Sequence, residues 1–194
     1  CLTLGYSLVF EPVYNTGDAP DYLNYAKAIA EGRATESFLH RSPLYPWLLS
    51  LIISPLGVEK TTMVMMLFQY LLIFISGILL YIIIERSVSY KNVAFYSVLL
   101  FYINFSVIFY GYMVLTEVLT LFLFLLTVWL LDKGVHSSSA LFLFTSGIIA
   151  SLTILCRFNT LPVVAAFIII ILFSGGNTNK SVLTRLIGKS LIFL

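Results

Sequence analysis

The sequence predicts an all-α polytopic membrane protein. Apolar residues make up 60% of the 194 residues and charged residues only 10%, whereas a soluble domain carries roughly 25% charged residues. The chain also holds several apolar runs of the length, roughly 20 residues, that a helix needs to cross a bilayer. These runs are continuously apolar and do not alternate with polar residues, which disfavours a β-barrel.

The chain is expected to be the N-terminal part of one transmembrane domain that covers residues 1–194. It begins at Cys1 and ends in the apolar stretch KSLIFL, so we expect a piece of a longer protein. Residues 1–10 are predicted to end a first span, residues 11–60 to form an outer loop, and residues 61–194 to hold about five spans and the start of another. The predicted spans cover 61–84, 92–113, 116–132, 139–156 and 160–174, and a last one begins near 186.

The first half of the outer loop reads GDAPDYLNYAKAIAEG at 17–32 and predicts a short amphipathic helix in the membrane interface. Asp18 is the expected N-cap and Asp21 stands at the N3 position, in an acidic variant of the capping box. Gly32 suits the C-terminal stop. The face that carries Tyr22 is expected to turn toward the membrane.

The second half of the loop predicts another interfacial or re-entrant helix at 43–56. Pro43 suits its start, and Pro55 with Gly57 suits its end. Its apolar part is too short to cross a hydrocarbon core about 30 Å thick. Trp47 is a residue type that sits at the level of the lipid headgroups. The outer loop is therefore expected to hold two interfacial helices.

The distribution of Lys and Arg favours an outer position for this loop. With the loop outside, the inner segments hold six Lys and Arg residues and the outer segments hold five. The charge rule is least reliable for long loops, and without the first loop the count is six against one. The inner set is Arg86, Lys91, Lys133, Lys180, Arg185 and Lys189.

Polar residues from three separate parts of the chain are expected to meet at this outer surface. They are Asp18, Asp21, His40 and Arg41 in the loop, Glu117 at the start of the third span, and Arg157 with Asn159 at the end of the fourth. Ionisable groups flanked by apolar sequence are unfavourable in a membrane and are usually functional. Structural roles stay open as well: Asp18 and Asp21 as helix caps, and Glu117 and Arg157 as charges that favour helix dipoles.

Short motifs stand in a distinctive order along the chain. D-x-x-x-Y-x-x-x-A at Asp18, Tyr22 and Ala26 is followed by I-A-E-G, R-S-P-L-Y-P-W-L-L, L-T-E-V-L and C-R-F-N-T-L. Their order and placement resemble the N-terminal part of GT-C-fold membrane glycosyltransferases. The chain is most similar to the group that contains the protein O-mannosyltransferases and the bacterial aminoarabinose transferases of lipid A.

The resemblance implies a GT-C-like helical bundle with two interfacial helices in the first outer loop. It also implies transfer of a sugar from a polyprenyl-phosphate carrier to an acceptor at the outer face of the membrane, with inversion at the sugar carbon. Asp18 falls on the family's loop aspartate, the proposed general base. The family often has a second acid directly after it, where this chain has Ala19, and Asp21 comes three residues after Asp18.

The chemistry of this transfer gives expected roles to the other polar residues. An acceptor hydroxyl needs a base, which a carboxylate provides, and the departing phosphate needs positive charge. Arg157 or Arg41 is expected to contact the phosphate through bidentate hydrogen bonds, and Glu117 is expected to position reacting groups. The expected substrate-binding residues are Arg157, Arg41, Glu117, Asp21, His40, Tyr22 and Asn159.

The sequence shows no metal-ligand spacing and no disulfide framework, so no cofactor and no metal is expected. Two acids near a phosphate still leave room for a divalent ion. The expected partners are the lipid bilayer and the polyprenyl-phosphate sugar donor, with no nucleic acid and with the acceptor unknown. We expect a multi-pass protein of a bacterial or archaeal plasma membrane. Two alternatives stay open, a transporter or lipid flippase and a non-catalytic membrane subunit.

Overall fold

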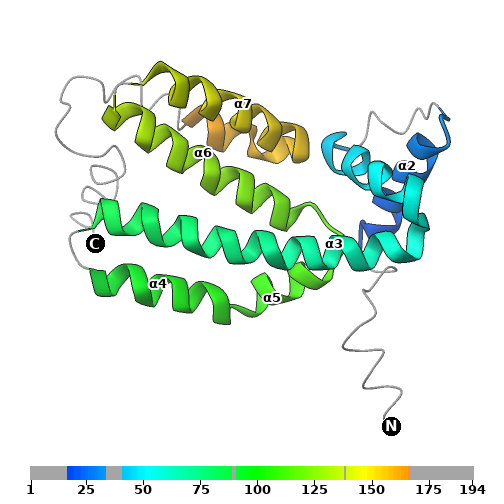
Figure 1. Cartoon of the computed structure of the whole chain (residues 1–194), viewed down its shortest axis with the longest axis horizontal. Helices are drawn as coiled ribbons and strands as arrows, with labels where there is room; N and C mark the ends of the chain where they lie inside the picture. Colours follow the sequence, from blue (N-terminus) through cyan, green and yellow to red (C-terminus); the bar gives the residue numbers. More distant parts are fainter. Residues whose placement is uncertain (1–16, 34–40, 89–90, 138, 167–194) are drawn as a thin grey trace, which may run out of the picture. The chain divides into compact units, whose positions relative to one another are not determined.

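The protein is an all-α polytopic membrane protein, as the sequence predicts (Figure 1). The computed structural model describes residues 17–33, 41–88, 91–137 and 139–166. Within these ranges the chain forms helices and connecting turns and contains no strand.

Two of the described helices are long and apolar enough to cross a membrane, α3 (Leu44–Ser87) and α6 (Glu117–Ser137). A third span results when α4 (Lys91–Ile103) and α5 (Phe105–Tyr112) count as one broken helix. α7 (Ala140–Cys156) is apolar but shorter. The number of spans in the described part of the chain is therefore two or three by length and composition.

The chain divides into two compact units. The first consists of Cys1–Ile73 with Asn104–Leu119, and the second of Phe74–Ile103 with Thr120–Leu194. Both α3 and α6 contribute residues to each unit. The loop aspartates and Glu117 belong to the first unit.

The first predicted interfacial helix is α2 (Ala19–Ala30), and it ends where the sequence predicts. The N–H of Gly32 donates to the carbonyl of Ile29 at 3.0 Å, and the N–H of Arg33 donates to the carbonyl of Ala28 at 2.9 Å. These two bonds make up a Schellman motif. Gly32 has φ +69°, a conformation that glycine adopts without steric strain.

The predicted capping hydrogen bond of Asp18 does not form. Asp18 does occupy the N-cap position, but its side chain makes no capping bond and its backbone is helical, with φ −85° and ψ −4°. A capping residue normally has an extended backbone. The carboxylate of Asp18 instead pairs with a distant residue, Arg41. Asp21 stands at N3 as predicted, and its carboxylate also pairs with Arg41.

The buried face of α2 corrects the expectation for Tyr22. This side chain, expected to turn toward the membrane, is buried within the first unit together with Leu23 and Ala26. Its ring meets the ring of Tyr45 edge-on, with 5.4 Å between the centroids. Tyr22 and Ala26 lie one turn apart on the same helical face. That face packs inside the protein because an aromatic partner at the start of α3 covers it.

The second predicted interfacial helix forms the start of α3, and Gly57 separates it from the span that follows. Gly57 has φ +76° and ψ 171°, a combination that is essentially confined to glycine. Before this break, Tyr45, Leu49 and Ile53 recur at four-residue spacing and are buried. Trp47 on another face is 53% exposed. A short helix with an exposed apolar side chain suits the membrane interface.

The predicted span at 92–113 is broken at Asn104, where the chain leaves the helical conformation. The backbone of Asn104 is extended, with φ −66° and ψ 117°. Its side-chain oxygen accepts a hydrogen bond from the N–H of Ser106 at 2.9 Å. An asparagine that caps a new helix competes with continuation of the old one. An apolar run that is continuous in composition therefore becomes two helices.

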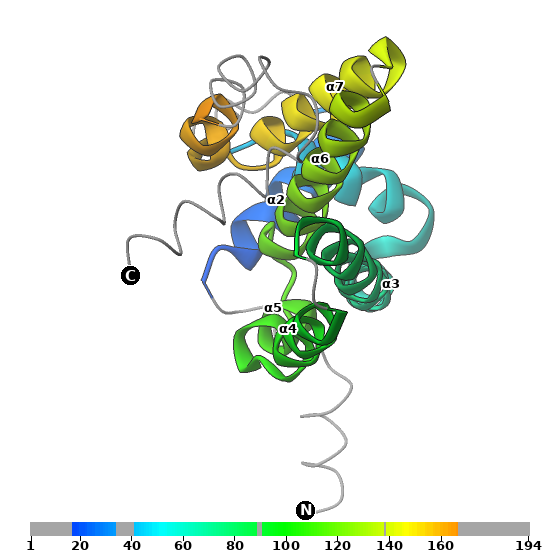
Figure 2. The same ribbon diagram turned by 90° about the vertical axis from the view of Figure 1, so that its left-hand side faces the viewer.

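In the second unit, α6 lies between α7 and the C-terminal part of α3, as Figure 1 and Figure 2 both show. The buried core between α3 and α6 consists of Leu79, Ile83, Leu125 and Val128. Nη1 of Arg86 lies 3.3 Å from Oδ2 of Asp132. Both residues are predicted for the inner side of the membrane, and their pairing places them at the same end of this unit.

The remaining predicted spans are described in part. α7 matches the prediction of 139–156, and residues 161–166 are helical within the predicted span at 160–174. The rest of that span lies outside the described residues, as do the predicted end of a first span at 1–10 and the span expected near 186.

Candidate active site

The guanidinium of Arg41 joins both aspartates of the first loop. Its Nη1 lies 2.7 Å from Oδ2 of Asp18, and its Nη2 donates to Oδ1 of the same carboxylate at 2.7 Å. Nη2 also donates to Oδ2 of Asp21 at 2.7 Å. The hydrogen bonds with Asp18, and after them those with Asp21, raise the pKa of Arg41. The planar fork of arginine fits a carboxylate in this bidentate way and fits a phosphate in the same way.

This cluster is open to a ligand. The side chains of Asp18 and Asp21 are each 53% exposed, and the side chain of Arg41 is 27% exposed. Exposed ion pairs contribute only about 0–1 kcal/mol to stability. An incoming anion can therefore replace a carboxylate on Arg41 with little loss of stability. The cluster combines two exposed carboxylates with a partly exposed guanidinium.

Tyr22 lies directly beneath Arg41. The Cζ atom of Arg41 is 5.6 Å from the centroid of the Tyr22 ring, within the range of a cation–π interaction. The side chain of Thr116 forms a hydrogen bond with Tyr22. Burial raises the pKa of Tyr22, and the negative charges of Asp18 and Glu117 add to the rise.

Glu117, after the turn that precedes α6, brings a negative charge near Tyr22. It is the first residue of α6 and is half-buried. Thr116, its neighbour in sequence, is 2% exposed and contacts Tyr22. The first unit thus brings together five of the residues that the sequence predicts for the site. These residues are Asp18, Asp21, Tyr22, Arg41 and Glu117.

Of the other three predicted site residues, two are described within the second unit and one lies outside the described residues. Arg157 and Asn159 belong to the second unit. Arg157 is an extended residue between α7 and the short 3-10 helix η2 (Phe158–Thr160), and its backbone N–H donates to the carbonyl of Thr153 at 3.0 Å. Asn159 is exposed. His40 lies outside the described residues, so the roles of these three residues stay predictions.

A buried polar contact in α3 belongs to the surroundings of the site, although the sequence analysis does not predict it. Nε2 of Gln69 donates to the hydroxyl of Tyr45 at 2.8 Å and to the carbonyl of Leu115 at 3.2 Å. Both Gln69 and Tyr45 are 0% exposed. The sequence carries one signal for this contact, an amide side chain in the middle of an apolar run. Polar groups within a membrane span usually have a specific partner.

Within the described part of the chain, no three His, Cys, Asp or Glu side chains gather in a way that could hold a metal ion. Asp18 and Asp21 share the cation of Arg41. The sequence predicts no metal, and this expectation remains a prediction.

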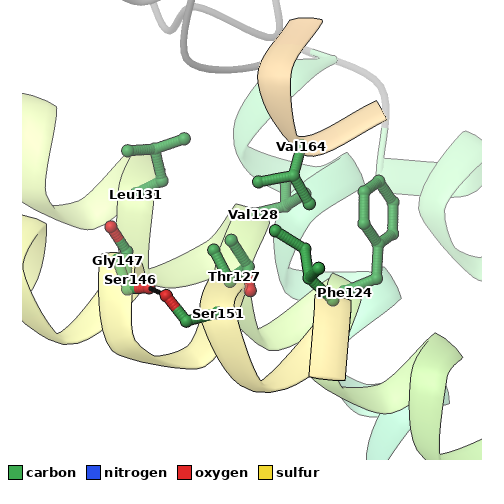
Figure 3. A pocket seen from close by; sticks show the side chains of 10 residues that line it. Phe124, Thr127, Val128, Leu131, Ser146, Gly147, Ser151 and Val164 are labelled. Carbon is green, nitrogen blue, oxygen red and sulfur yellow. Dashed lines mark hydrogen bonds between the residues drawn. The ribbon is translucent and has the colours of Figure 1, made fainter. Parts of the chain in front are cut away.

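A separate apolar pocket lies in the second unit, between α6, α7 and residues 161–166. Its volume is about 150 Å³. Figure 3 shows Ser146 and Gly147 of α7 near Leu131 of α6 at one side of the pocket and Phe124 at the other, with Val164 above Thr127. None of the predicted site residues lines it.

One comparison with known proteins identifies a family for this chain. Neither the curated proteins nor the solved structures gave a significant match. The family described as dolichyl-phosphate-mannose-protein mannosyltransferase matches residues 40–194, well over half of the chain. Arg41, Glu117, Arg157 and Asn159 fall inside the matched range, whereas Asp18 precedes it. The chain belongs to the dolichyl-phosphate-mannose-protein mannosyltransferase family and is a membrane glycosyltransferase of the GT-C type.

Proposed function

We propose that this glycosyltransferase moves a sugar from a polyprenyl-phosphate carrier to an acceptor hydroxyl at the outer face of the membrane. Asp18 acts as the general base and Arg41 binds the donor phosphate. The observation that carries the proposal is the fork of Arg41 on the carboxylate of Asp18, which supports it because the pair joins a carboxylate to a guanidinium that fits phosphate equally well. The family description supports a dolichyl-type phosphate as carrier and mannose as the sugar.

The proposed reaction is a single displacement. The acceptor oxygen forms a bond with the anomeric carbon while the bond between that carbon and the phosphate oxygen breaks. The phosphate leaves with the electron pair, and the acceptor proton passes to Asp18. A glycosyl phosphate already has a good leaving group, so its departure needs positive charge rather than an acid. Attack from the face opposite to the phosphate inverts the configuration of the sugar carbon.

Arg41 has a second role in this proposal, because it is hydrogen-bonded to the carboxylate that must accept the proton. Its hydrogen bonds to Asp18 use both carboxylate oxygens. When the donor phosphate takes the guanidinium fork, these oxygens become available to the acceptor hydroxyl. The exchange is favoured by the modest strength of exposed ion pairs and by the good fit of guanidinium to phosphate. Donor binding thus frees the base in the same step.

The surroundings of the cluster support a lipid-linked donor. α2 and the start of α3 are short helices before the first long span, and Trp47 presents an exposed apolar side chain there. Interfacial helices of this kind lie at the boundary between headgroups and acyl chains. A phosphate on a polyprenyl carrier occupies the same depth. The excess of Lys and Arg on the opposite side supports the outer face as the site of transfer.

The substitution Asp18→Asn tests the proposal directly. It keeps the size and the N-cap position of the side chain but removes its basicity. Transfer of labelled sugar from a polyprenyl-phosphate donor, measured with the full-length protein in lipid nanodiscs, should fall about 10²- to 10⁴-fold. Glu31→Gln, at the other end of α2, is the matched control and should transfer normally. Undiminished transfer by Asp18→Asn would show that another group is the base.

A further inference from the structure

Two series of contacts connect Gln69 with Tyr22. In the first, Nε2 of Gln69 donates to the hydroxyl of Tyr45, whose ring meets the ring of Tyr22 edge-on at 5.4 Å. In the second, the same Nε2 donates to the carbonyl of Leu115. The next residue, Thr116, forms a hydrogen bond with Tyr22. The two series hold Tyr22 both at its ring and at its hydroxyl.

We propose that Gln69 is the positioning residue of this site, which fixes Tyr22 and, through it, the guanidinium of Arg41 beside Asp18. The inference rests on the proposed function, because it assigns Gln69 a role in placing the phosphate-binding group and the base. Gln69 belongs to α3, Tyr22 to α2 and Thr116 to the turn before α6. One side chain therefore ties together the three segments that supply Arg41, Asp18 and Glu117.

The chemistry of the amide explains why glutamine suits this position. A carbonyl oxygen needs a donor, so the N–H₂ end of Gln69 faces Leu115, and its second hydrogen reaches Tyr45. A carboxylate at the same place would face the carbonyl of Leu115 with an acceptor, and an aliphatic side chain would make neither bond. A buried amide that loses its partners destabilises its surroundings. The two bonds of Nε2 fix the amide end of Gln69, whereas its buried Oε1 has no hydrogen-bond partner among the described residues.

Gln69 touches neither base nor cation, so its effect on the reaction passes through Tyr22. Arg41 lies 5.6 Å over the Tyr22 ring, and a tilt of that ring moves the guanidinium relative to the carboxylate of Asp18. Misplacement of reacting groups by about 1 Å lowers rates by up to about 100-fold. A change at Gln69 is therefore expected to reach the chemistry without any contact to the donor.

The first arm of the test measures kcat/KM for sugar transfer by the full-length protein in nanodiscs. Gln69→Leu and Tyr45→Phe should each lower kcat/KM, by up to about 100-fold for Gln69→Leu. The double variant should match Gln69→Leu, because that change already removes the bond to the Tyr45 hydroxyl. Ser76→Ala removes another fully buried polar side chain of α3 and should keep the wild-type kcat/KM.

The second arm needs no activity and follows the ionisation of Tyr22 by tyrosinate absorbance. The difference between a protein and its Tyr22→Phe counterpart isolates this residue from the 12 tyrosines of the chain. Burial raises the pKa of Tyr22 in the wild type, with Asp18, Glu117 and Arg41 as the charges around it. In Gln69→Leu and Tyr45→Phe the midpoint should shift from the wild-type value, because the hydrogen bond from Thr116 and the charge of Arg41, which both lower the pKa of Tyr22, depend on the position of its ring.

The two arms separate failure of the inference from failure of the proposed function. A wild-type protein that transfers no sugar refutes the proposed function, while the Tyr22 midpoint still decides whether Gln69 positions Tyr22. An unchanged midpoint in the variants overturns the inference, whether or not kcat/KM falls. If Gln69→Leu does not fold, Tyr45→Phe decides alone, since it removes a single oxygen from the same hydrogen bond.

Discussion

The two terminal nitrogens of Arg41 bind the two carboxylate oxygens of Asp18 at 2.7 Å, across 23 residues of sequence. The second aspartate of the loop, Asp21, receives one further bond from Nη2. This asymmetry distinguishes two acids that stand on the same helix turn. Both carboxylate oxygens of Asp18 bind the guanidinium, whereas Asp21 binds it through one oxygen.

Asp21→Asn should have a much smaller effect than loss of the base. The amide keeps an oxygen that can accept from Nη2 of Arg41, and the bidentate pair with Asp18 remains. We expect kcat/KM for sugar transfer to fall by about tenfold or less, in line with the loss of roughly one charge-assisted hydrogen bond. Parallel assays of Asp21→Asn and Asp18→Asn measure the difference. Equal losses in the two variants would mean that both carboxylates share the catalytic role.

Arg41→Lys should weaken donor binding although it keeps the positive charge. A lysine is a point charge and cannot make the bidentate fork that a guanidinium makes with phosphate. A hydrogen bond to a charged group contributes roughly 1.5–3 kcal/mol, so KM for the polyprenyl-phosphate donor should rise about tenfold or more. Initial rates at varied donor concentration give this value.

The matched control for this change is Arg33→Lys. Arg33 is exposed and pairs with Glu31 at the far end of α2, so its replacement alters the same helix without touching the Arg41 fork. A donor KM that is equal in the wild type, Arg33→Lys and Arg41→Lys would remove Arg41 from phosphate binding.

Tyr22 should make the protein less stable as the pH rises above about 10. An unfolded tyrosine has a pKa of about 10, and burial raises the pKa of Tyr22 in the fold. Between these two values the unfolded state has released a proton that the folded state keeps. The free energy of unfolding therefore falls as the pH rises through this window, and below it the contribution is constant.

Thermal unfolding in nanodiscs between about pH 8 and about pH 11 measures this slope. Tyr22→Phe removes the ionisable hydroxyl and should flatten the decline in melting temperature. Tyr25→Phe controls for the loss of a hydroxyl from the same helix. The explanation fails if the wild type and Tyr22→Phe lose stability with the same slope.

Gly57 should not tolerate a side chain. Its φ of +76° and ψ of 171° fall in a region where other residues incur about 1–3 kcal/mol of strain. Gly57→Ala should therefore lower the free energy of unfolding by about that amount, although no atom lies within 4 Å of the added Cβ. Gly147→Ala is the control, because Gly147 is helical and equally uncrowded. Equal stability of the two variants would argue against a constrained break between the interfacial helix and the span.

The fold class and the two short helices that precede the first long span could be predicted from the sequence because they depend on local properties. Apolar runs predict helices in lipid irrespective of their neighbours. The stop of α2 at Gly32 and the break at Gly57 depend on the freedom of glycine at positive φ. At Asn104 the same local logic misses a break within the predicted span 92–113, because apolar composition hides a side-chain cap that starts a new helix.

The contacts of the site could be predicted only in part. Topology places Asp18, Arg41 and Glu117 at one surface, and these residues do lie in one unit. Local rules assign the carboxylate of Asp18 to the helix start, but a guanidinium 23 residues away binds it instead. The burial of Tyr22 and the contacts of Gln69 depend on partners from other segments, which periodicity within one helix does not reveal.

The anomeric configuration of the product tests the central claim most directly. The wild-type full-length protein is supplied with a polyprenyl-phosphate mannose of defined anomeric configuration, and the glycosylated acceptor is examined by NMR. A single displacement with Asp18 as base predicts a sugar of inverted configuration. A product that retains the donor's configuration, or no transfer from this donor, would contradict the account.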